Sequence, residues 1–143
     1  AASSLTASFR TLGARRLVFV SETAQEGHDR KLGFLRQAGY DIVADKAMSL
    51  ESSDVYCTTP PEFWFDAVRA MKTEDCDAYF ISCANIHSID VITKLEAALD
   101  RPVVTSNQAA LWCALRTAGI DDAIDGLGRL GTMDLAMPAV AAE

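Results

Sequence analysis

The chain has 143 residues, 50% of them hydrophobic, and its 13 basic and 20 acidic residues give a formal net charge of −7. This length and hydrophobic share suit a folded domain with a sizeable core, which excludes disorder, collagen and coiled coil for the whole chain. An acidic chain without a basic tract argues against nucleic-acid and anionic-membrane partners, because both need clustered Lys and Arg. The first ten residues lack the pattern of a secretory signal, so we expect a cytoplasmic protein with four reduced cysteines.

Short apolar runs alternate with helical patterns along the chain. The apolar runs predict four strands, at 16–21, 41–44, 77–82 and 102–105. Apolar residues at helical spacing predict helices at 28–38, 60–71, 88–99 and 107–118, preceded by a first helix that ends near residue 14. Alternating strands and helices imply parallel strands with right-handed crossovers. The predicted fold class is therefore α/β, with a four-stranded parallel sheet flanked by helices.

Local signals add detail to these elements. Phe34 is expected on the inner side of its helix, and the polar stretch 49–59 is expected to be a loop. Thr59 is expected to cap the helix that follows it, with Glu62 completing a capping box. The Gly-, Ala- and Met-rich stretch 126–143 is expected to be a loosely packed tail.

One internal similarity suggests a repeated unit. LTASFRTLGA at 5–14 resembles LWCALRTAGI at 111–120, with Leu first, Arg-Thr near the end and Gly as the stop. Two amphipathic helices can share such a pattern by chance, and a duplicated lobe explains it equally well. The second interpretation divides the chain into a leading helix from a preceding lobe (1–14), an α/β lobe (15–125) and a C-terminal tail (126–143).

Parallel α/β sheets bind ligands at the carboxyl ends of their strands. Four segments are therefore expected to share one rim: 21–23, 49–56, 82–85 and 105–107. They are rich in small polar residues, which suits a pocket for a small anion.

Cys83 is the most conspicuous residue of this rim, because it leaves a buried strand and enters a turn before a predicted helix. Free N–H groups and the dipole of a helix N-terminus stabilise an anion and lower the pKa of a thiol. The same turn could hold a substrate carboxylate or an enediolate. The alternative is that Cys83 is simply a small apolar residue at a tight strand end.

The remaining thiols and imidazoles carry weaker signals. Cys57 lies on the same edge as Cys83, Cys76 lies at the opposite edge, and Cys113 is expected to pack in a helix. His87 follows Cys83 by four residues, so a Cys–His pair is conceivable. More often a His in the first turn of a helix is simply exposed to solvent, and the same is expected of His28.

The run FISCANIHSIDVITKLEAALDRPVVTSNQAALWCALRTAGI at 80–120 resembles the aspartate/glutamate racemase superfamily. The similarity is to the branch of maleate cis–trans isomerases, arylmalonate decarboxylases and the racemase-like proteins of ectoine breakdown. The matching features are Ser82-Cys83 at a strand end, a Pro-Val-Val strand, Ser106-Asn107 and a helix ending at Gly119; GLGRL at 126–130 resembles the closing motif of the branch.

The resemblance implies one lobe of a two-lobe racemase-like fold, with the substrate held between lobes and no metal or organic cofactor. Cys83 is the implied catalytic residue. The implied substrate-binding residues are Ser82, Ala84, Asn85, Ser21, Thr23, Ser106 and Asn107. Thr23 stands where the family often has a Tyr that binds a substrate carboxylate, so carboxylate recognition is expected to differ.

The resemblance implies a cofactor-independent isomerase that acts on a small dicarboxylate through a cysteine thiolate, with maleate as the first substrate to consider. An arylmalonate decarboxylase-like or Asp/Glu racemase-like enzyme is the alternative. The partners expected are a small carboxylate substrate and a complementary lobe or a second copy of the chain. A non-catalytic lobe that binds a small anion or another chain is the hypothesis of a different class.

Overall fold

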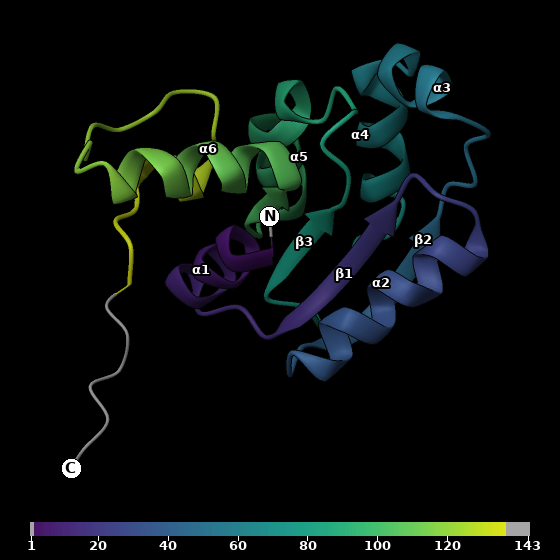
Figure 1. Ribbon diagram of the computed structural model, residues 1–143, viewed down its shortest axis with the longest axis horizontal. Coiled ribbons are helices and arrows are strands. Elements are labelled where there is room, and N and C mark those ends of the chain that lie inside the picture. The colour runs from purple at the N-terminus through teal and green to yellow at the C-terminus, as the bar shows by residue number, and fades with distance from the viewer. Residues whose placement is uncertain (1, 137–143) are drawn as a thin grey trace.

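A computed structural model describes residues 2–136 and contains one four-stranded sheet in the order β2-β1-β3-β4 (Figure 1). The strands are β1 (Arg16–Ser21), β2 (Asp41–Ala47), β3 (Ala78–Ile81) and β4 (Val103–Thr105). Each neighbouring pair is parallel. The predicted α/β class with a four-stranded parallel sheet is confirmed.

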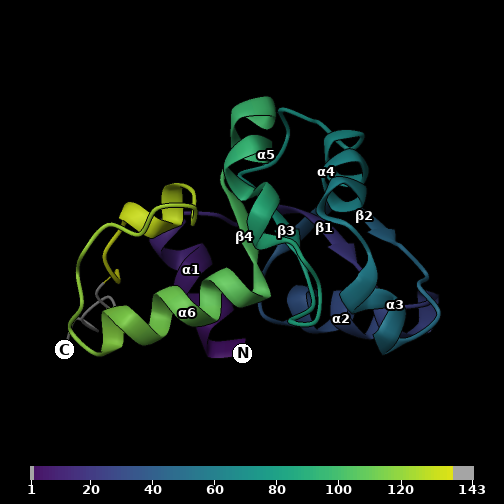
Figure 2. The ribbon, with the colours of Figure 1, turned by 90° about the horizontal axis from the view of Figure 1, so that it is seen from above.

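The helices cover both faces of this sheet. Their bounds are α1 (Ala2–Leu12), α2 (Gln25–Gln37), α3 (Ser53–Thr58), α4 (Pro61–Arg69), α5 (Ile92–Leu99) and α6 (Ser106–Thr117), with 3₁₀ turns η1 (Ile89–Val91) and η2 (Arg129–Thr132). Figure 2 shows α4 and α5 on one face of the sheet, and α2 and α6 on the other. Sequential residues of a strand point to opposite faces. Accordingly Val18 and Val20 pack toward α4 and α5, whereas Leu17 and Phe19 pack toward α1 and α2.

Several helix boundaries differ from the sequence expectation. The stretch expected to be a loop contains α3, and the Thr59 hydroxyl donates to the Val55 carbonyl in the last turn of that helix (2.6 Å). Thr59 therefore does not cap α4, whose N-cap is Pro60 without a side-chain hydrogen bond. The capping box of this chain lies instead at the start of α6, where Thr105 and Gln108 bond each other's backbone amides.

Aromatic residues were the least well predicted part of the core. Phe34 is 50% exposed, so its expected position on the inner side of α2 is wrong. Trp64 is fully buried beneath α4, although the sequence pattern did not single it out. A helix places its residues around a full circle, so neighbours in sequence can lie on opposite faces.

The C-terminal segment is packed as far as residue 136. Leu127 and Leu130 are buried against Trp112 of α6. The Arg116 guanidinium donates to the carbonyls of Gly131 (2.9 Å) and Met133 (2.9 Å). The expected loose tail is therefore wrong for residues 126–136, and residues 137–143 lie outside the described part of the chain.

The two helices that resemble each other in sequence lie side by side, since α1 packs against α6 in Figures 1 and 2. Phe9 of α1 is fully buried in the core shared with α2 and the sheet. The origin of α1 in a preceding lobe, and with it the division at residues 14 and 125, stays a prediction.

Candidate functional site

The predicted rim exists at the carboxyl edge of the sheet. The Ser82 amide donates to the Val20 carbonyl (2.9 Å), which joins the ends of β1 and β3. The Cys83 amide donates to the Ser106 hydroxyl (3.2 Å), which joins the end of β3 to the first residue of α6. Cys83 thus lies where three chain segments meet.

Asn85 and Asn107 lie on this rim, but both side chains bind neighbouring chain. The Asn85 amide group donates to the Ser53 hydroxyl (2.9 Å), which ties the Cys83 loop to α3. The Asn107 amide group donates to the Ala84 carbonyl (3.0 Å). Both side chains therefore shape the loop that follows Cys83.

The environment of the Cys83 thiol differs from the one expected. Residues 84–88 form no helix, and α5 begins only at Ile92, so the helix expected to start directly after Cys83 is not there. Burial raises the pKa of the thiol above its usual range; the Asn85 amide, 3.3 Å from the sulfur, lowers it, and the Glu22 carboxylate raises it further. The expectation of a lowered pKa for Cys83 is wrong. The half-buried residue also has a positive φ of 103°, which is unusual for a residue with a Cβ.

Glu22 is a site residue that the sequence reasoning missed. It follows Ser21 at the end of β1 and is nearly fully buried. Both of its carboxylate oxygens accept from the Lys31 ammonium of α2, each at 2.8 Å. The only signal in the sequence was an acidic residue directly after a buried strand, and nothing local indicates its partner nine residues later.

His28 was also misjudged, because it is fully buried and not solvated. Its Nδ1 lies 2.6 Å from the Ser21 hydroxyl and its Nε2 lies 2.9 Å from the Asp45 carboxylate. The imidazole also stacks on the Phe19 ring. This chain of side chains links β2, α2 and β1, and it fixes the hydroxyl of Ser21 beneath the rim.

Thr23 lies two residues before the start of α2, with its hydroxyl 3.5 Å from that of Ser21. Gly27 makes room for it, because a Cβ there would lie 2.9 Å from the Thr23 hydroxyl oxygen. Thr23 and Ser82 also line one cavity of about 360 Å³, which the Lys31 side chain borders. The remaining lining residues are mostly apolar: Leu5, Gly27, Arg30, Phe34, Leu35 and Phe80.

A second cavity of about 350 Å³ is lined by His87 and by Ala84 and Asn85 of the loop that follows Cys83. His87 Nε2 lies 2.9 Å from the Cys57 carbonyl oxygen, so His87 is bonded to the end of α3. Cys57 is exposed and lines this cavity too. The sequence hypothesis of a Cys83–His87 pair therefore finds no support in the geometry.

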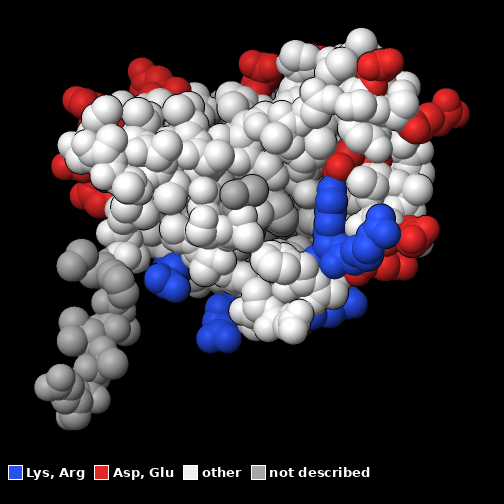
Figure 3. Space-filling view, viewed as in Figure 1, with Lys and Arg blue, Asp and Glu red and all other residues white. Residues whose placement is uncertain are grey.

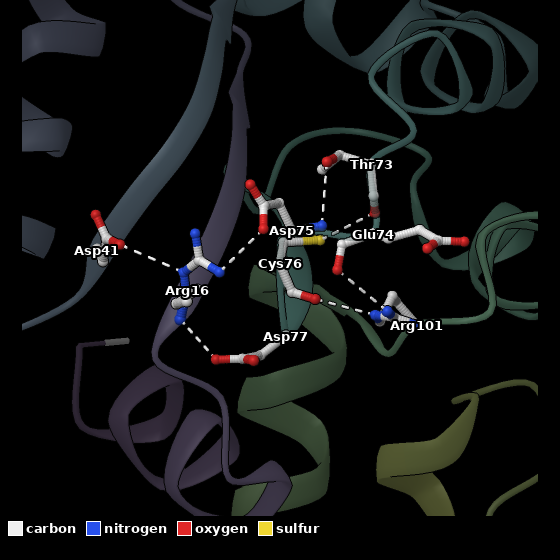
Figure 4. Close-up of polar contacts among 8 residues, drawn as sticks. All are labelled: Arg16, Asp41, Thr73, Glu74, Asp75, Cys76, Asp77 and Arg101. Carbon is white, nitrogen blue, oxygen red and sulfur yellow. Dashed lines mark hydrogen bonds and ion pairs between the residues drawn. The ribbon is translucent and has the colours of Figure 1, made fainter.

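Cys76 lies at the amino edge of the sheet, opposite the rim (Figure 4). Burial raises the pKa of its thiol, which contacts the Thr73 carbonyl (3.8 Å). Nearby, the backbone amides of Arg16 and Arg15 bond the Asp77 carboxylate and lower its pKa. These contacts close the loop that enters β3, and they place Cys76 away from the site.

Neither a metal site nor a membrane span is found among residues 2–136. No group of three or more His, Cys, Asp or Glu side chains there is placed to hold a metal ion. No helix in that range combines the length and the apolar character needed to cross a bilayer.

Fold and site together define a parallel α/β lobe that presents a cysteine among small polar residues at the carboxyl edge of its sheet. The family model described as arylmalonate decarboxylase matches residues 1–131, and the chain belongs to this family. The resemblance noted from the sequence is thereby confirmed.

Curated relatives of known name match most of this chain. It is 28% identical over 124 residues to an arylmalonate decarboxylase of Bordetella bronchiseptica, covering 85% of this chain and 52% of the relative. It is 26% identical over 140 residues to a maleate isomerase of Nocardia farcinica, covering 96% of this chain and 55% of the relative. The chain therefore spans about half the length of the curated relatives it matches.

Solved structures of the same two kinds share the fold. The maleate isomerase Iso of Pseudomonas putida superposes with a TM-score of 0.88 at 23% identity, covering 92% of this chain and 53% of that one. An arylmalonate decarboxylase superposes with a TM-score of 0.80 at 26% identity, covering 90% of this chain and 58% of that one. The racemase-like lobe predicted from the sequence is confirmed.

Proposed function

We propose that the protein is a cofactor-independent enzyme that converts a small dicarboxylate at Cys83, with maleate cis–trans isomerisation as its reaction. The position of Cys83 carries this proposal. It lies at the carboxyl edge of a parallel sheet, where such folds bind ligands, and on a backbone with positive φ, as functional residues often are. The family shared with maleate isomerases supports the same reading.

In the proposed isomerisation the thiol first loses its proton, and the thiolate sulfur then adds to one carbon of the substrate double bond. Rotation about the resulting single bond and loss of the sulfur give the trans product and regenerate the thiolate. A Nocardia farcinica maleate cis–trans isomerase mutant has been solved with a covalently bound succinylcysteine intermediate, which supports bond formation between a cysteine sulfur and the substrate in that enzyme.

The substrate carboxylates would be held by polar groups of the rim. Thr23 and Ser82 offer hydroxyls to one cavity, and Lys31 brings a positive charge to its border. The loop of Ala84 and Asn85 offers backbone amides near the sulfur. These local donors would offset the net negative charge of the chain, which repels a dicarboxylate at long range.

A decarboxylase is the second candidate, and one specific observation favours it. Burial and the Glu22 carboxylate raise the pKa of the Cys83 thiol, so the thiol keeps its proton near neutral pH. A protonated thiol suits the transfer of a proton to an enediolate, which is the role that a decarboxylase needs. The Bordetella bronchiseptica relative is an arylmalonate decarboxylase.

Parallel assays separate these reactions. The protein is incubated with maleate and, separately, with phenylmalonate, and fumarate or released CO₂ is measured. We expect turnover of maleate that Cys83→Ser abolishes and that Cys57→Ser, which alters an exposed thiol on the same edge, leaves unchanged. CO₂ release from phenylmalonate without fumarate formation assigns the decarboxylase. Wild-type turnover by Cys83→Ser would show that the chemistry lies elsewhere.

We also propose that a second wall faces Cys83, formed by a complementary lobe or by another copy of this chain. The curated relatives are nearly twice as long as their matching stretches, which supports this arrangement. Sedimentation of the active protein measures it. Turnover by a single-lobe monomer would refute the second wall. If neither substrate is turned over and maleate protects Cys83 from an alkylating reagent, a non-catalytic binding lobe is favoured.

A further inference from the structure

Three segments bring a thiol, a carboxylate and an ammonium together at the rim. Val20 of β1 pairs with Ile81 of β3, and Glu22 and Cys83 each follow two residues later along these neighbouring segments. The charge of Glu22 acts on the Cys83 thiol, which places the two groups near each other. Lys31 reaches the same point from α2. In Figure 3 the largest group of Lys and Arg side chains in view lies at the right, on the side of α2.

The Glu22 carboxylate is held in a single position. The residue is 5% exposed, and both oxygens accept from the Lys31 ammonium at 2.8 Å. The Lys31 side chain is 33% exposed, so one member of the ion pair reaches solvent and the other is buried. A buried ion pair adds little net stability, because desolvation offsets the attraction. Its presence beside the Cys83 thiol therefore points to chemistry.

The groups that face the thiol act on its proton in opposite directions. Burial favours the neutral thiol, and the negative charge of Glu22 does the same. The Asn85 amide and the Lys31 charge favour the thiolate. Of these groups, Glu22 is the one that can accept a proton from sulfur and return it.

We propose that Glu22 is the acid/base partner of Cys83 and that Lys31 is the positioning residue of Glu22. The S–H bond of Cys83 breaks as an O–H bond forms on Glu22, which leaves a thiolate and a neutral carboxyl group beside the Lys31 ammonium. When the thiolate is released, the proton returns to it from Glu22. The catalytic use of this exchange rests on the proposed function, but the exchange itself does not.

The pH dependence of Cys83 alkylation tests the contact without any substrate. Iodoacetamide labelling is followed by peptide mass spectrometry, which resolves Cys83 from the other thiols. We expect Glu22→Gln to lower the midpoint pH by about one unit, because a charge that opposes the thiolate is gone. Lys31→Met is expected to raise the midpoint. Glu26→Gln is the matched control, since Glu26 is 87% exposed, pairs with Arg30 and should leave the midpoint unchanged.

Turnover tests the proton transfer itself. Glu22→Gln makes the thiol more acidic and yet removes the group that carries the proton. We expect kcat for maleate to fall at least about tenfold with KM within about twofold, and Glu22→Asp to restore part of the loss. An unchanged midpoint in Glu22→Gln, or an unchanged kcat, would overturn the proposal. If the wild-type protein turns over neither maleate nor phenylmalonate, the proposed function fails, and the alkylation midpoints alone test the role of Glu22. If Glu22→Gln does not fold, the midpoints of Lys31→Met and Glu22→Asp test that role instead.

Discussion

Replacing Cys83 by glycine should remove the reactive group and yet relieve the backbone. Cys83 has a φ of 103°, a region in which a Cβ crowds the neighbouring carbonyl oxygens. Its amide is held there by the Ser106 hydroxyl (3.2 Å). Glycine reaches this conformation without steric cost, whereas alanine keeps the strain and loses only the sulfur.

The magnitude follows from two opposing effects. A residue held in a sparsely populated backbone region costs about 1–3 kcal/mol, and this cost disappears in Cys83→Gly. The glycine variant loses about 0.5–1 kcal/mol of folding stability, because its unfolded chain has the greater conformational entropy. The difference makes Cys83→Gly more stable than Cys83→Ala by about 1 kcal/mol, which corresponds to about 2–4 °C in Tm for a chain of this size.

Thermal unfolding of the two variants, followed by circular dichroism under identical buffer conditions, measures this difference. Ala84→Gly serves as the control, because Ala84 does not have a positive φ and glycine there should only destabilise. Both Cys83 variants should lack turnover. If Cys83→Ala melts at the same temperature as Cys83→Gly or at a higher one, the backbone at Cys83 is not strained and the reasoning is refuted.

Four further predictions concern buried contacts that stabilise the fold. Gly128→Ala should lower the free energy of unfolding in urea by about 2 kcal/mol, because a Cβ would lie 2.7 Å from the Glu96 carboxylate at a φ of 58°. Burial raises the pKa of Glu96 in the folded protein, so its protonated form contributes stability below its ordinary value near ~4.3, and this contribution is lost as the pH rises through the raised pKa. Melting temperatures from pH 4 to 8 should therefore fall in the wild type relative to Glu96→Gln, and parallel curves would contradict this. Arg116→Met removes three hydrogen bonds to backbone carbonyls and should cost about 3 kcal/mol in the same urea assay, with an unchanged unfolding midpoint as the contrary result. His28→Leu removes the imidazole that lies 2.6 Å from the buried hydroxyl of Ser21 and should cost about 2 kcal/mol, whereas a cost near zero would show that this hydrogen bond is not formed.

The sequence sufficed for the parts of the fold that depend on local patterns. Short apolar runs predicted all four strands, and the alternation with helices predicted the parallel sheet, because crossovers of this kind allow few other arrangements. The position of Cys83 followed from the same reasoning, since the end of a parallel strand faces the ligand-binding edge. The capping box at Thr105 was missed in favour of Thr59, because the side-chain pattern is alike at both and only the backbone decides which hydroxyl is free.

The chemical environment of the site was decided by tertiary structure alone. Glu22 meets Lys31 because α2 packs back across the end of β1, and His28 meets Asp45 because β2 pairs beside β1. The raised pKa of the Cys83 thiol has the same origin, since burial and the charge of Glu22 act across two strands. A sequence pattern reports which face of its own element a side chain occupies. Electrostatic and hydrogen-bonding partners come from other elements, and their distances exist only once the sheet is ordered and the helices are packed on it.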